Sequence, residues 1–220
     1  MKTIAVIPAY NEDKNVREVV GRAMKFVDQV VVVDDGSTDC TYKTLEGLEA
    51  RVVVLRHKVN LGKGAALKTG CAAALQLGAD IIVMLDADGQ HKPEKIPEFI
   101  KQFENKEVQI VFGSRNIGRD MPLVMMLGNK LLSLTSSILF KVYISDTQSG
   151  FRAFRAAVYP KIEWYSTDYS VETEVVVRTG KHKLPFREID IETIYTNIYK
   201  GTTFVDGIRI FINMLIWRIS

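Results

Sequence analysis

Short apolar runs alternate with longer helix-like stretches along the first half of the chain. Runs rich in β-branched residues predict strands at residues 3–7, 30–33, 52–55, 81–85 and 110–112. The stretches between them predict helices near residues 13–27, 38–48, 63–77 and 93–104. Uninterrupted apolar strands are typical of a sheet that is covered on both faces. The pattern therefore predicts an α/β fold with a doubly wound, mostly parallel sheet.

The regular alternation of strand-like and helix-like stretches ends after residue 112. A helical stretch follows at about residues 122–143, then a polar segment at 146–152, and then helical and strand-like pieces as far as residue 195. The chain has no linker rich in Pro, Gly or Ser, no internal repeat and no low-complexity tract. We therefore expect one domain over residues 1–220.

Composition narrows the class of protein. With 220 residues, 47% of them hydrophobic and 25% charged, the chain can bury a globular core, which excludes disordered and fibrous classes. A net charge of +3 with scattered basic residues gives no support to nucleic-acid binding. Cys40 and Cys71 lack a partner motif, so we expect reduced thiols and a reducing compartment. The N-terminus does not resemble a signal peptide, and a cytoplasmic location is expected.

Polar segments follow four of the predicted strands. They cover residues 8–12, 34–39, 60–64 and 86–91. Ligands bind beyond the carboxyl ends of the strands in open α/β sheets. The four segments therefore predict one binding site at one edge of the sheet.

The segment Asp86-Ala87-Asp88-Gly89-Gln90-His91 places two carboxylates directly after a buried strand. Carboxylate oxygens suit hard cations, and Mg²⁺ is commonly held by one or two carboxylates together with substrate phosphates. This segment predicts a Mg²⁺ or Mn²⁺ site that works with a diphosphate, although a solvated turn is the simpler alternative.

Two further segments suit parts of a nucleotide. An acidic residue in the turn at 34–39 could accept hydrogen bonds from ribose or from a base N–H, and helix capping is the alternative. Asn60-Leu61-Gly62-Lys63-Gly64 places two glycines and a lysine at a helix start, which suits an anion, but lacks the spacing of a P-loop. We expect His57 and His182 to be surface or structural residues.

Six segments together resemble a known family. In order they are Pro8–Glu12, Asp34–Asp39, 60–65, Asp86–His91, Gly113-Ser114-Arg115 and 146–152. This series is similar to the motifs of family 2 glycosyltransferases of the GT-A fold, particularly the dolichol-phosphate mannose synthase-like branch, over residues 3 to about 155. The resemblance implies a Rossmann-like GT-A domain. Residues 1–115 would bind the nucleotide sugar, 116–204 the acceptor, and 205–220 would form an apolar helix.

The resemblance also implies roles for individual residues. Asp86, Asp88 and Gln90 would surround the metal, and Asp88, Arg115 and Arg152 would act in catalysis. Acceptor contacts are expected from Arg115, Lys130, Ser133, Arg152 and Lys200. Donor and metal contacts are expected from Pro8, Ala9, Tyr10, Asn11, Glu12, Asp34, Asp35, Lys63, Asp86, Ala87, Asp88 and Gln90.

We therefore expect an inverting transfer of a hexose, mannose or glucose, from a GDP- or UDP-sugar to a polyprenyl (dolichyl) phosphate. A phosphate acceptor is already anionic, so it needs nearby cations rather than a general base. The chain departs from the branch at Asn129-Lys130, where an arginine pair is common, and near Lys200. The alternatives are a sugar hydroxyl acceptor, with Asp146 as the first candidate base, and a non-catalytic regulator that binds nucleotide sugars.

The segment 208–218 is apolar on most faces and carries arginines near both ends. A buried core helix and a helix lying at a lipid surface both fit this pattern. No apolar stretch reaches the roughly 20 residues of a membrane-spanning helix. Any membrane contact is therefore expected to be peripheral.

Overall fold

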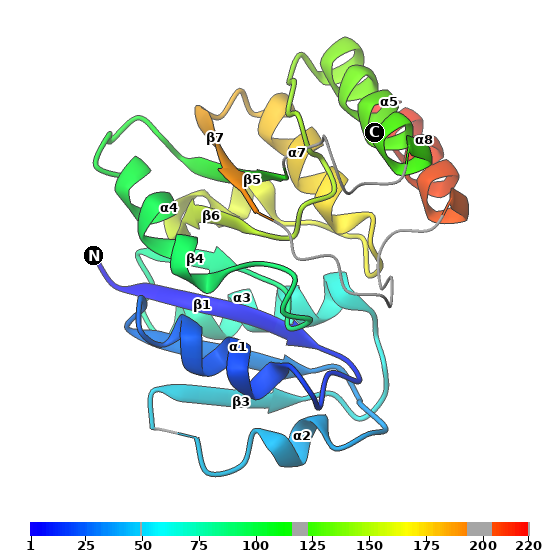
Figure 1. Ribbon diagram of the computed structural model, residues 1–220. Coiled ribbons are helices and arrows are strands. Elements are labelled where there is room, and N and C mark those ends of the chain that lie inside the picture. The colour runs from blue at the N-terminus through cyan, green and yellow to red at the C-terminus, as the bar shows by residue number, and fades with distance from the viewer. Residues whose placement is uncertain (49, 116–122, 193–203, 220) are drawn as a thin grey trace.

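The computed structural model describes residues 1–48, 50–115, 123–192 and 204–219. Its centre is a seven-stranded sheet in the order β3-β2-β1-β4-β6-β5-β7 (Figure 1). The strands are β1 Thr3–Ala9, β2 Gln29–Asp34, β3 Val52–Arg56, β4 Ile81–Met84, β5 Ile110–Arg115, β6 Arg152–Arg155 and β7 Phe186–Ile191.

Strand β6 is the exception in an otherwise parallel sheet. It lies between β4 and β5 and runs antiparallel to both, pairing Met84 and Phe112 with Arg152. Strands β6 and β7 come from the second half of the chain, yet they complete the sheet that the first half begins. The predicted single-domain α/β fold with a mostly parallel sheet is therefore confirmed.

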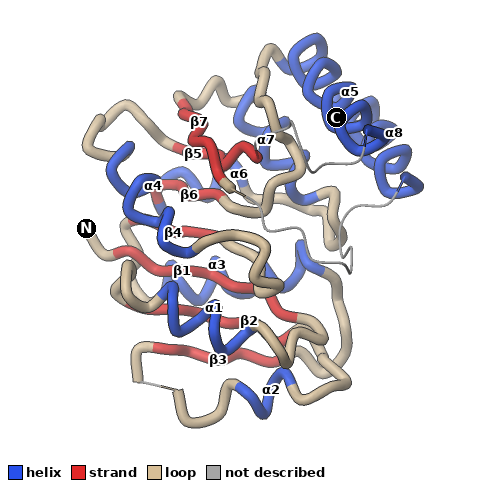
Figure 2. The backbone as a smooth tube through the Cα atoms, viewed as in Figure 1, coloured by secondary structure: helices blue, strands red, loops and turns tan. Residues whose placement is uncertain are grey.

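Helices cover both faces of the sheet (Figure 2). Both faces of β1 are apolar and therefore need a cover, because successive side chains of a strand point to opposite faces. Ile4 and Val6 pack into the core beneath α3 and α7. Ala5 and Ile7 pack into the core beneath α1 and α4. The α-helices are α1 Val16–Ala23, α2 Thr41–Thr44, α3 Lys63–Gln76, α4 Ile96–Gln102, α5 Leu123–Phe140, α6 Tyr159–Ile162, α7 Val171–Lys181 and α8 Phe204–Ile219. Short 3₁₀ helices lie at Pro93–Lys95 and Ala156–Val158.

The helix expected over residues 38–48 is wrong in extent, because only the single turn α2 forms. Around the start of this segment, hydroxyl groups instead accept hydrogen bonds from the loop after β1. Ser37 Oγ accepts a hydrogen bond from Asn11 N at 3.0 Å, and Thr41 Oγ1 accepts one from Glu12 N at 2.8 Å. These contacts fasten the first polar loop to the second.

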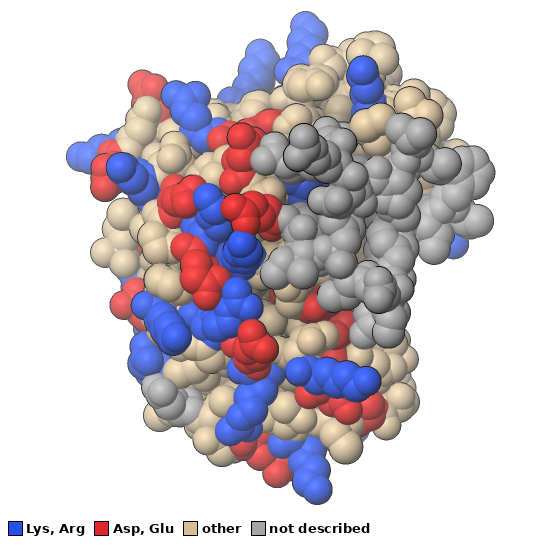
Figure 3. All heavy atoms as spheres, in the orientation of Figure 1, with Lys and Arg blue, Asp and Glu red and all other residues tan. Residues whose placement is uncertain are grey.

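Helices α5 and α8 pack side by side at one end of the molecule (Figures 1 and 2). Each has a buried face: Ile210 and Met214 of α8 are in the core, as is Leu132 of α5. Within the described residues, no helix is long and apolar enough to cross a membrane. Elsewhere on the face in Figure 3, acidic and basic side chains are interspersed.

Candidate nucleotide-sugar site

A pocket of about 500 Å³ opens where the parallel strands end. All four polar segments predicted from the sequence converge on it, the third of them through Asn60, Gly62 and Lys63. Its lining includes these predicted donor residues: Pro8, Ala9, Tyr10, Asn11, Glu12, Asp35, Lys63, Asp86, Ala87 and Asp88. The topology thus brings together residues that are up to 80 positions apart in the chain, as expected for the carboxyl edge of such a sheet.

Asp34 and Asp35 are adjacent but face different environments. Asp35 lines the pocket, and its carboxylate accepts backbone hydrogen bonds from Leu61 and Gly62. Asp34 does not line the pocket: it is fully buried, accepts a hydrogen bond from Ser37 N at 3.1 Å and pairs with Arg56 Nε at 3.0 Å. Successive strand residues point to opposite faces, so the expected donor contact of Asp34 is replaced by a role in closing the turn.

Asp86 is paired with a partly buried lysine. Lys63 Nζ lies 2.6 Å from Asp86 Oδ1 and 2.8 Å from Glu172 Oε1. Burial opposes ionisation of Asp86, but the nearby ammonium, followed by other cationic groups, holds the pKa of Asp86 below its ordinary value. Burial likewise disfavours the charged lysine, and the two carboxylates outweigh it, so the pKa of Lys63 is raised.

Asp88 lies in a more negative environment. Burial, and then the negative charge of Asp86, raise the pKa of Asp88 to about 6. A divalent cation between the two carboxylates would remove this repulsion, so the pair suits Mg²⁺ or Mn²⁺ with phosphate oxygens as further ligands. Among the described residues, no group of three or more His, Cys, Asp or Glu side chains forms a complete metal site.

Gln90, expected beside the metal, lies outside the pocket lining, and His91 is buried next to it. The backbone of Gln90 donates a hydrogen bond to Asp88 Oδ1 at 2.9 Å, but the residue does not line the pocket. His91 is buried behind Asp86, with Nε2 4.0 Å from Asp86 Oδ2 and its ring beside Phe151. Burial lowers the pKa of His91 to about 4, so the imidazole is neutral at pH 7.

The glycines at the start of α3 serve a close backbone approach. Gly64 N donates to Thr167 O at 2.8 Å, and a Cβ on Gly64 would lie 2.2 Å from Ser166 O. Gly62 N is taken by Asp35. The expectation that this helix start offers its N–H groups to an anion is wrong for these two residues, because the N–H groups already have partners within the protein. Lys63 supplies the positive charge instead.

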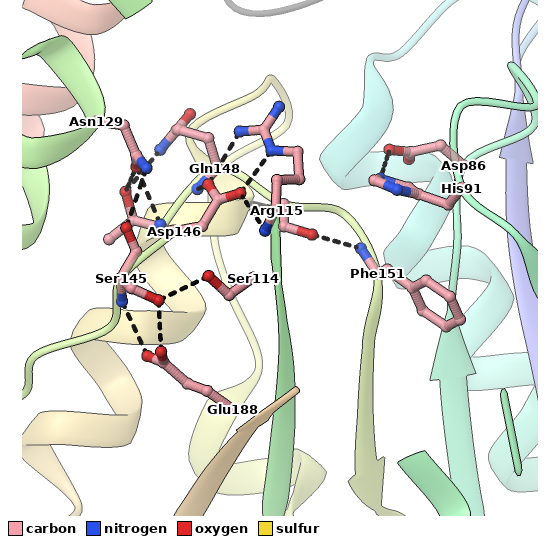
Figure 4. A network of polar contacts seen from close by, with 12 residues as sticks. Asp86, His91, Ser114, Arg115, Asn129, Ser145, Asp146, Gln148, Phe151 and Glu188 are labelled. Carbon is pink, nitrogen blue, oxygen red and sulfur yellow. Dashed lines mark hydrogen bonds and ion pairs between the residues drawn. The ribbon is translucent and has the colours of Figure 1, made fainter. Parts of the chain in front are cut away.

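Arg115 lies at the end of β5 and grips a buried carboxylate (Figure 4). Its Nε lies 2.5 Å from Asp146 Oδ2, and its Nη2 lies 2.9 Å from Asp146 Oδ1. Burial disfavours ionised Asp146, but hydrogen bonds and the charge of Arg115 lower the pKa of Asp146 overall. This pairing argues against Asp146 as a general base, because a carboxylate held ionised by a bidentate arginine is a weak proton acceptor.

A polar network fixes the loop that carries Asp146 (Figure 4). Asn129 of α5 donates to Ser145 O at 3.1 Å and accepts from Thr147 N at 3.1 Å. Glu188 of β7 accepts from Ser145 N at 2.9 Å. Asn129, which replaces an expected arginine, therefore positions this loop from inside the protein.

Arg152 is a structural residue rather than an acceptor contact. It is 1% exposed, and its guanidinium donates to the carbonyl oxygens of Ser149, Glu172 and Thr147. Burial lowers the pKa of Arg152 to about 10, and the group remains charged at pH 7. Because its hydrogen bonds are made within the protein, the expected grip on an acceptor phosphate does not follow.

The remaining predicted acceptor residues are dispersed. Lys130 is exposed on α5, whereas Ser133 is buried on the same helix and its Oγ has no hydrogen-bond partner among the described residues. Lys200 lies outside the described residues. The structure thus gathers most of the predicted donor residues in one pocket, and it leaves the predicted acceptor residues only partly placed.

Sequence reasoning missed several residues around the pocket. Asp168 and Tyr169 complete its wall, and Glu172 lies behind Lys63. Glu174, which is 2% exposed, accepts hydrogen bonds from the backbone of Tyr165 and Ser166 and so holds that wall in place. Two glutamates beside an apolar run in 171–177 were the available signal, since buried carboxylates require partners.

Comparison with known proteins identifies the family. Residues 4–163 match glycosyl transferase family 2. The chain belongs to this family. It is therefore a glycosyltransferase, and the family predicted from the six motifs is confirmed.

Two known proteins are similar in sequence to this glycosyltransferase over most of their length. It is 35% identical to UDP-N-acetylglucosamine--dolichyl-phosphate N-acetylglucosaminyltransferase of Methanococcus voltae, with 98% of this chain and 95% of that protein covered. It is 29% identical to polyprenol monophosphomannose synthase of Mycolicibacterium smegmatis, with 95% of this chain and 83% of the other covered.

The fold is also that of solved glycosyltransferases. The structure of glucosyl-3-phosphoglycerate synthase from Mycobacterium tuberculosis, in complex with Mn²⁺, UDP and phosphoglyceric acid, superposes with a TM-score of 0.77. The two chains are 22% identical, and the match covers 100% of this chain and 78% of the other. At this identity the likeness supports the GT-A fold alone.

Proposed function

We propose that this glycosyltransferase moves a sugar from a nucleoside diphosphate sugar to a polyprenyl phosphate. The observation that carries the proposal is the pocket at the strand ends, where Asp86, Asp88 and Lys63 provide charges suited to a metal-bound diphosphate. The 35% identity to a dolichyl-phosphate N-acetylglucosaminyltransferase over nearly all of both chains supports the acceptor class. It also makes UDP-N-acetylglucosamine the first donor to test, beside the mannose and glucose donors expected from the sequence.

Asp86 and Asp88 would hold the divalent ion, and a bound ion would stabilise negative charge on the departing diphosphate. Mg²⁺ and Mn²⁺ are the candidates, since related folds are crystallised with either ion and UDP. Lys63 would face the same phosphates from the start of α3. Its present partners Asp86 and Glu172 keep the ammonium at this position.

In the reaction, an oxygen of the acceptor phosphate forms a bond to the anomeric carbon of the sugar. The bond from that carbon to the diphosphate oxygen breaks, and the electron pair leaves with the nucleoside diphosphate. Attack from the face opposite the leaving group inverts the anomeric configuration. No proton has to be removed from an anionic phosphate, which agrees with the pairing of Asp146 to Arg115.

The surface of α5 and α8 supports a lipid acceptor. On α5, Leu127, Leu131, Leu134 and Ile138 are each more than half exposed and recur at helical spacing on one face. On α8 the exposed apolar residues are Ile208, Ile212, Leu215, Ile216 and Ile219. We call these nine side chains the apolar face.

We assign an anionic membrane surface as the occupant of the apolar face. Charged residues on the described parts of the two helices are Lys130, Arg209, Arg218 and Asp206, so positive charge predominates at its edges. An apolar face with basic edges is typical of segments that lie at the surface of a membrane containing anionic lipids. Such contact would bring a polyprenyl phosphate to the acceptor half of the protein.

A transfer assay tests the proposed function. The protein would be incubated with Mg²⁺ or Mn²⁺, dolichyl phosphate and radiolabelled UDP-N-acetylglucosamine, UDP-glucose or GDP-mannose in turn. We expect label in the organic phase with one of these donors. Label that appears only on a water-soluble sugar acceptor would overturn the lipid-phosphate assignment in favour of the hydroxyl alternative.

Arg115→Lys separates acceptor use from donor binding in the same assay. The lysine keeps a positive charge near Asp146 but loses the bidentate geometry. We expect the KM for dolichyl phosphate to rise while the Kd for the nucleotide, measured by calorimetry, is unchanged. An equal loss of nucleotide affinity would place Arg115 on the donor side.

A further inference from the structure

The Asp35 carboxylate is held almost completely by the protein. Its Oδ1 lies 2.6 Å from His57 Nδ1 and accepts from Leu61 N at 3.0 Å. Within the described part of the chain, Oδ2 accepts one hydrogen bond, from Gly62 N at 2.8 Å. A carboxylate oxygen can accept about two hydrogen bonds. Oδ1 is therefore filled, and Oδ2 retains one acceptor position in a residue that lines the pocket.

His57 connects this carboxylate to helix α3. Its Nε2 lies 3.0 Å from Thr69 Oγ1, and its side chain is 12% exposed. An ionised carboxylate can only accept, so Nδ1 of the histidine carries a proton; in the neutral ring, Nε2 then accepts from the Thr69 hydroxyl. The imidazole is thus held at both nitrogen atoms, and it prevents Asp35 from rotating away from the pocket.

We propose that His57 is a positioning residue that makes Asp35 selective for the nucleobase of the donor. With Oδ1 occupied, Asp35 offers a single acceptor, Oδ2, which suits the imino N–H of a uracil or guanine. Adenine and cytosine carry a ring acceptor at the equivalent place on their pairing edge, which a carboxylate oxygen would repel. The inference rests on the proposed nucleoside diphosphate donor and assigns its base class to the Thr69–His57–Asp35 chain.

Two conservative substitutions separate the two contacts of the imidazole. In His57→Asn the side-chain amide can reach Asp35 in place of Nδ1, but it no longer reaches Thr69. In His57→Gln the longer amide can reach Thr69 in place of Nε2, but it leaves Oδ1 without that donor. Both variants remove the ring, so both lose similar packing, and a matching unfolding temperature makes them controls for each other.

Calorimetry in Mg²⁺ would give the Kd of each variant for UDP, GDP, ADP, CDP and the base-free probe inorganic pyrophosphate. We expect the wild-type protein to prefer UDP or GDP over ADP and CDP, and His57→Asn to keep that preference. In His57→Gln the ratio of Kd values that measures the preference should fall about tenfold, which is the value of one hydrogen bond to a charged group. The Kd for pyrophosphate should be the same in all three. Thr69→Val removes only the contact between His57 Nε2 and the Thr69 hydroxyl, so this variant should retain more of the preference than His57→Gln.

Two results would overturn the role of His57 while leaving the proposed function intact. One is a base preference that none of the variants alters. The other is a loss of affinity in His57→Gln that is equally large for the nucleotides and for pyrophosphate. The second result would make His57 a residue of general structural importance. If the wild-type protein binds none of the nucleotides, the proposed donor class fails as well. The failure of the proposed function is therefore distinguishable from failure of the role of His57.

Discussion

Individual side chains at the pocket depend on their charged neighbours. Asp86 has the ammonium of Lys63 at 2.6 Å, whereas Asp88, two residues away, has the pKa of its carboxyl raised to about 6. Burial acts on both groups, so the difference comes from their charged neighbours: the ammonium of Lys63 lowers the pKa of Asp86, and the negative charge of Asp86 raises that of Asp88. The unequal pair is suited to a divalent ion, which would relieve the repulsion between the two carboxylates.

Asp88→Asn tests this assignment. The amide has nearly the shape of the carboxylate but cannot supply a negative ligand, so turnover with metal and donor should fall on the order of 100-fold. The unfolding temperature should stay the same or rise slightly, because repulsion from Asp86 is removed. Glu104→Gln, at an exposed position after α4, is the matched control and should leave turnover unchanged. Full activity of Asp88→Asn at saturating donor and metal would contradict a metal role.

Arg152→Ala should act on stability instead. Removing the guanidinium leaves three buried carbonyl oxygens without their donor, and we expect a loss of about 3–5 kcal/mol in the free energy of unfolding. Chemical denaturation would measure it. Arg187→Ala, on the exposed side of β7, should change stability by less than about 0.5 kcal/mol. A folded Arg152→Ala protein of normal stability that had lost only acceptor use would restore the original assignment.

At the scale of elements, the start of α3 and the wall of the pocket depend on each other. Gly64 N binds Thr167 O, and the buried indole of Trp164 donates to Gly64 O at 2.8 Å. The wall that contains Asp168 and Tyr169 is therefore fastened to the helix that carries Lys63. Displacing either element should disturb the other.

Gly64→Ala should break this contact. The new Cβ would meet the Ser166 carbonyl oxygen at 2.2 Å, a backbone atom that cannot move by a side-chain rotation. We expect a loss of about 1–3 kcal/mol in stability and weaker nucleotide binding by calorimetry. Gly21→Ala in α1 is the control: its Cβ would meet nothing within 4 Å, so stability should rise by about 0.5–1 kcal/mol. Equal effects of the two substitutions would argue against the contact.

At the scale of the molecule, α8 belongs both to the core and to the surface. Ile210 and Met214 are 1% and 0% exposed, whereas Ile212 and Ile216 are 50% and 56% exposed. The two expectations from the sequence, a core helix and a surface helix, therefore describe opposite faces of one helix. Removing α8 would lose both, so truncation cannot separate them.

Point substitutions can separate the two faces. Ile212→Ser with Ile216→Ser should reduce co-sedimentation with vesicles of anionic lipid and leave the unfolding temperature almost unchanged. Met214→Ala should lower the free energy of unfolding by about 2–5 kcal/mol and leave vesicle binding by the folded protein unchanged. Undiminished vesicle binding by the serine variant, or no vesicle binding by the wild-type protein, would contradict the assignment of a membrane as the partner of the apolar face.

The order of strands and polar loops determined in advance the sheet, the edge at which the pocket lies and most of the residues that line it. Apolar runs followed by short polar segments constrain the local backbone, and parallel strands bring their carboxyl ends to one edge. The motifs at 8–12, 34–35 and 86–88 could therefore be placed together without coordinates.

Only the tertiary structure decided which charged groups face the pocket and which are paired inside the protein. Asp34 and Asp35, or Arg115 and Arg152, are alike in sequence, but burial and distant partners give them different roles. His57 acquired its role from Asp35 and Thr69, which are 22 and 12 residues away. The cost of burying a polar group is set by the partners that the complete fold supplies, and a local sequence pattern does not contain them.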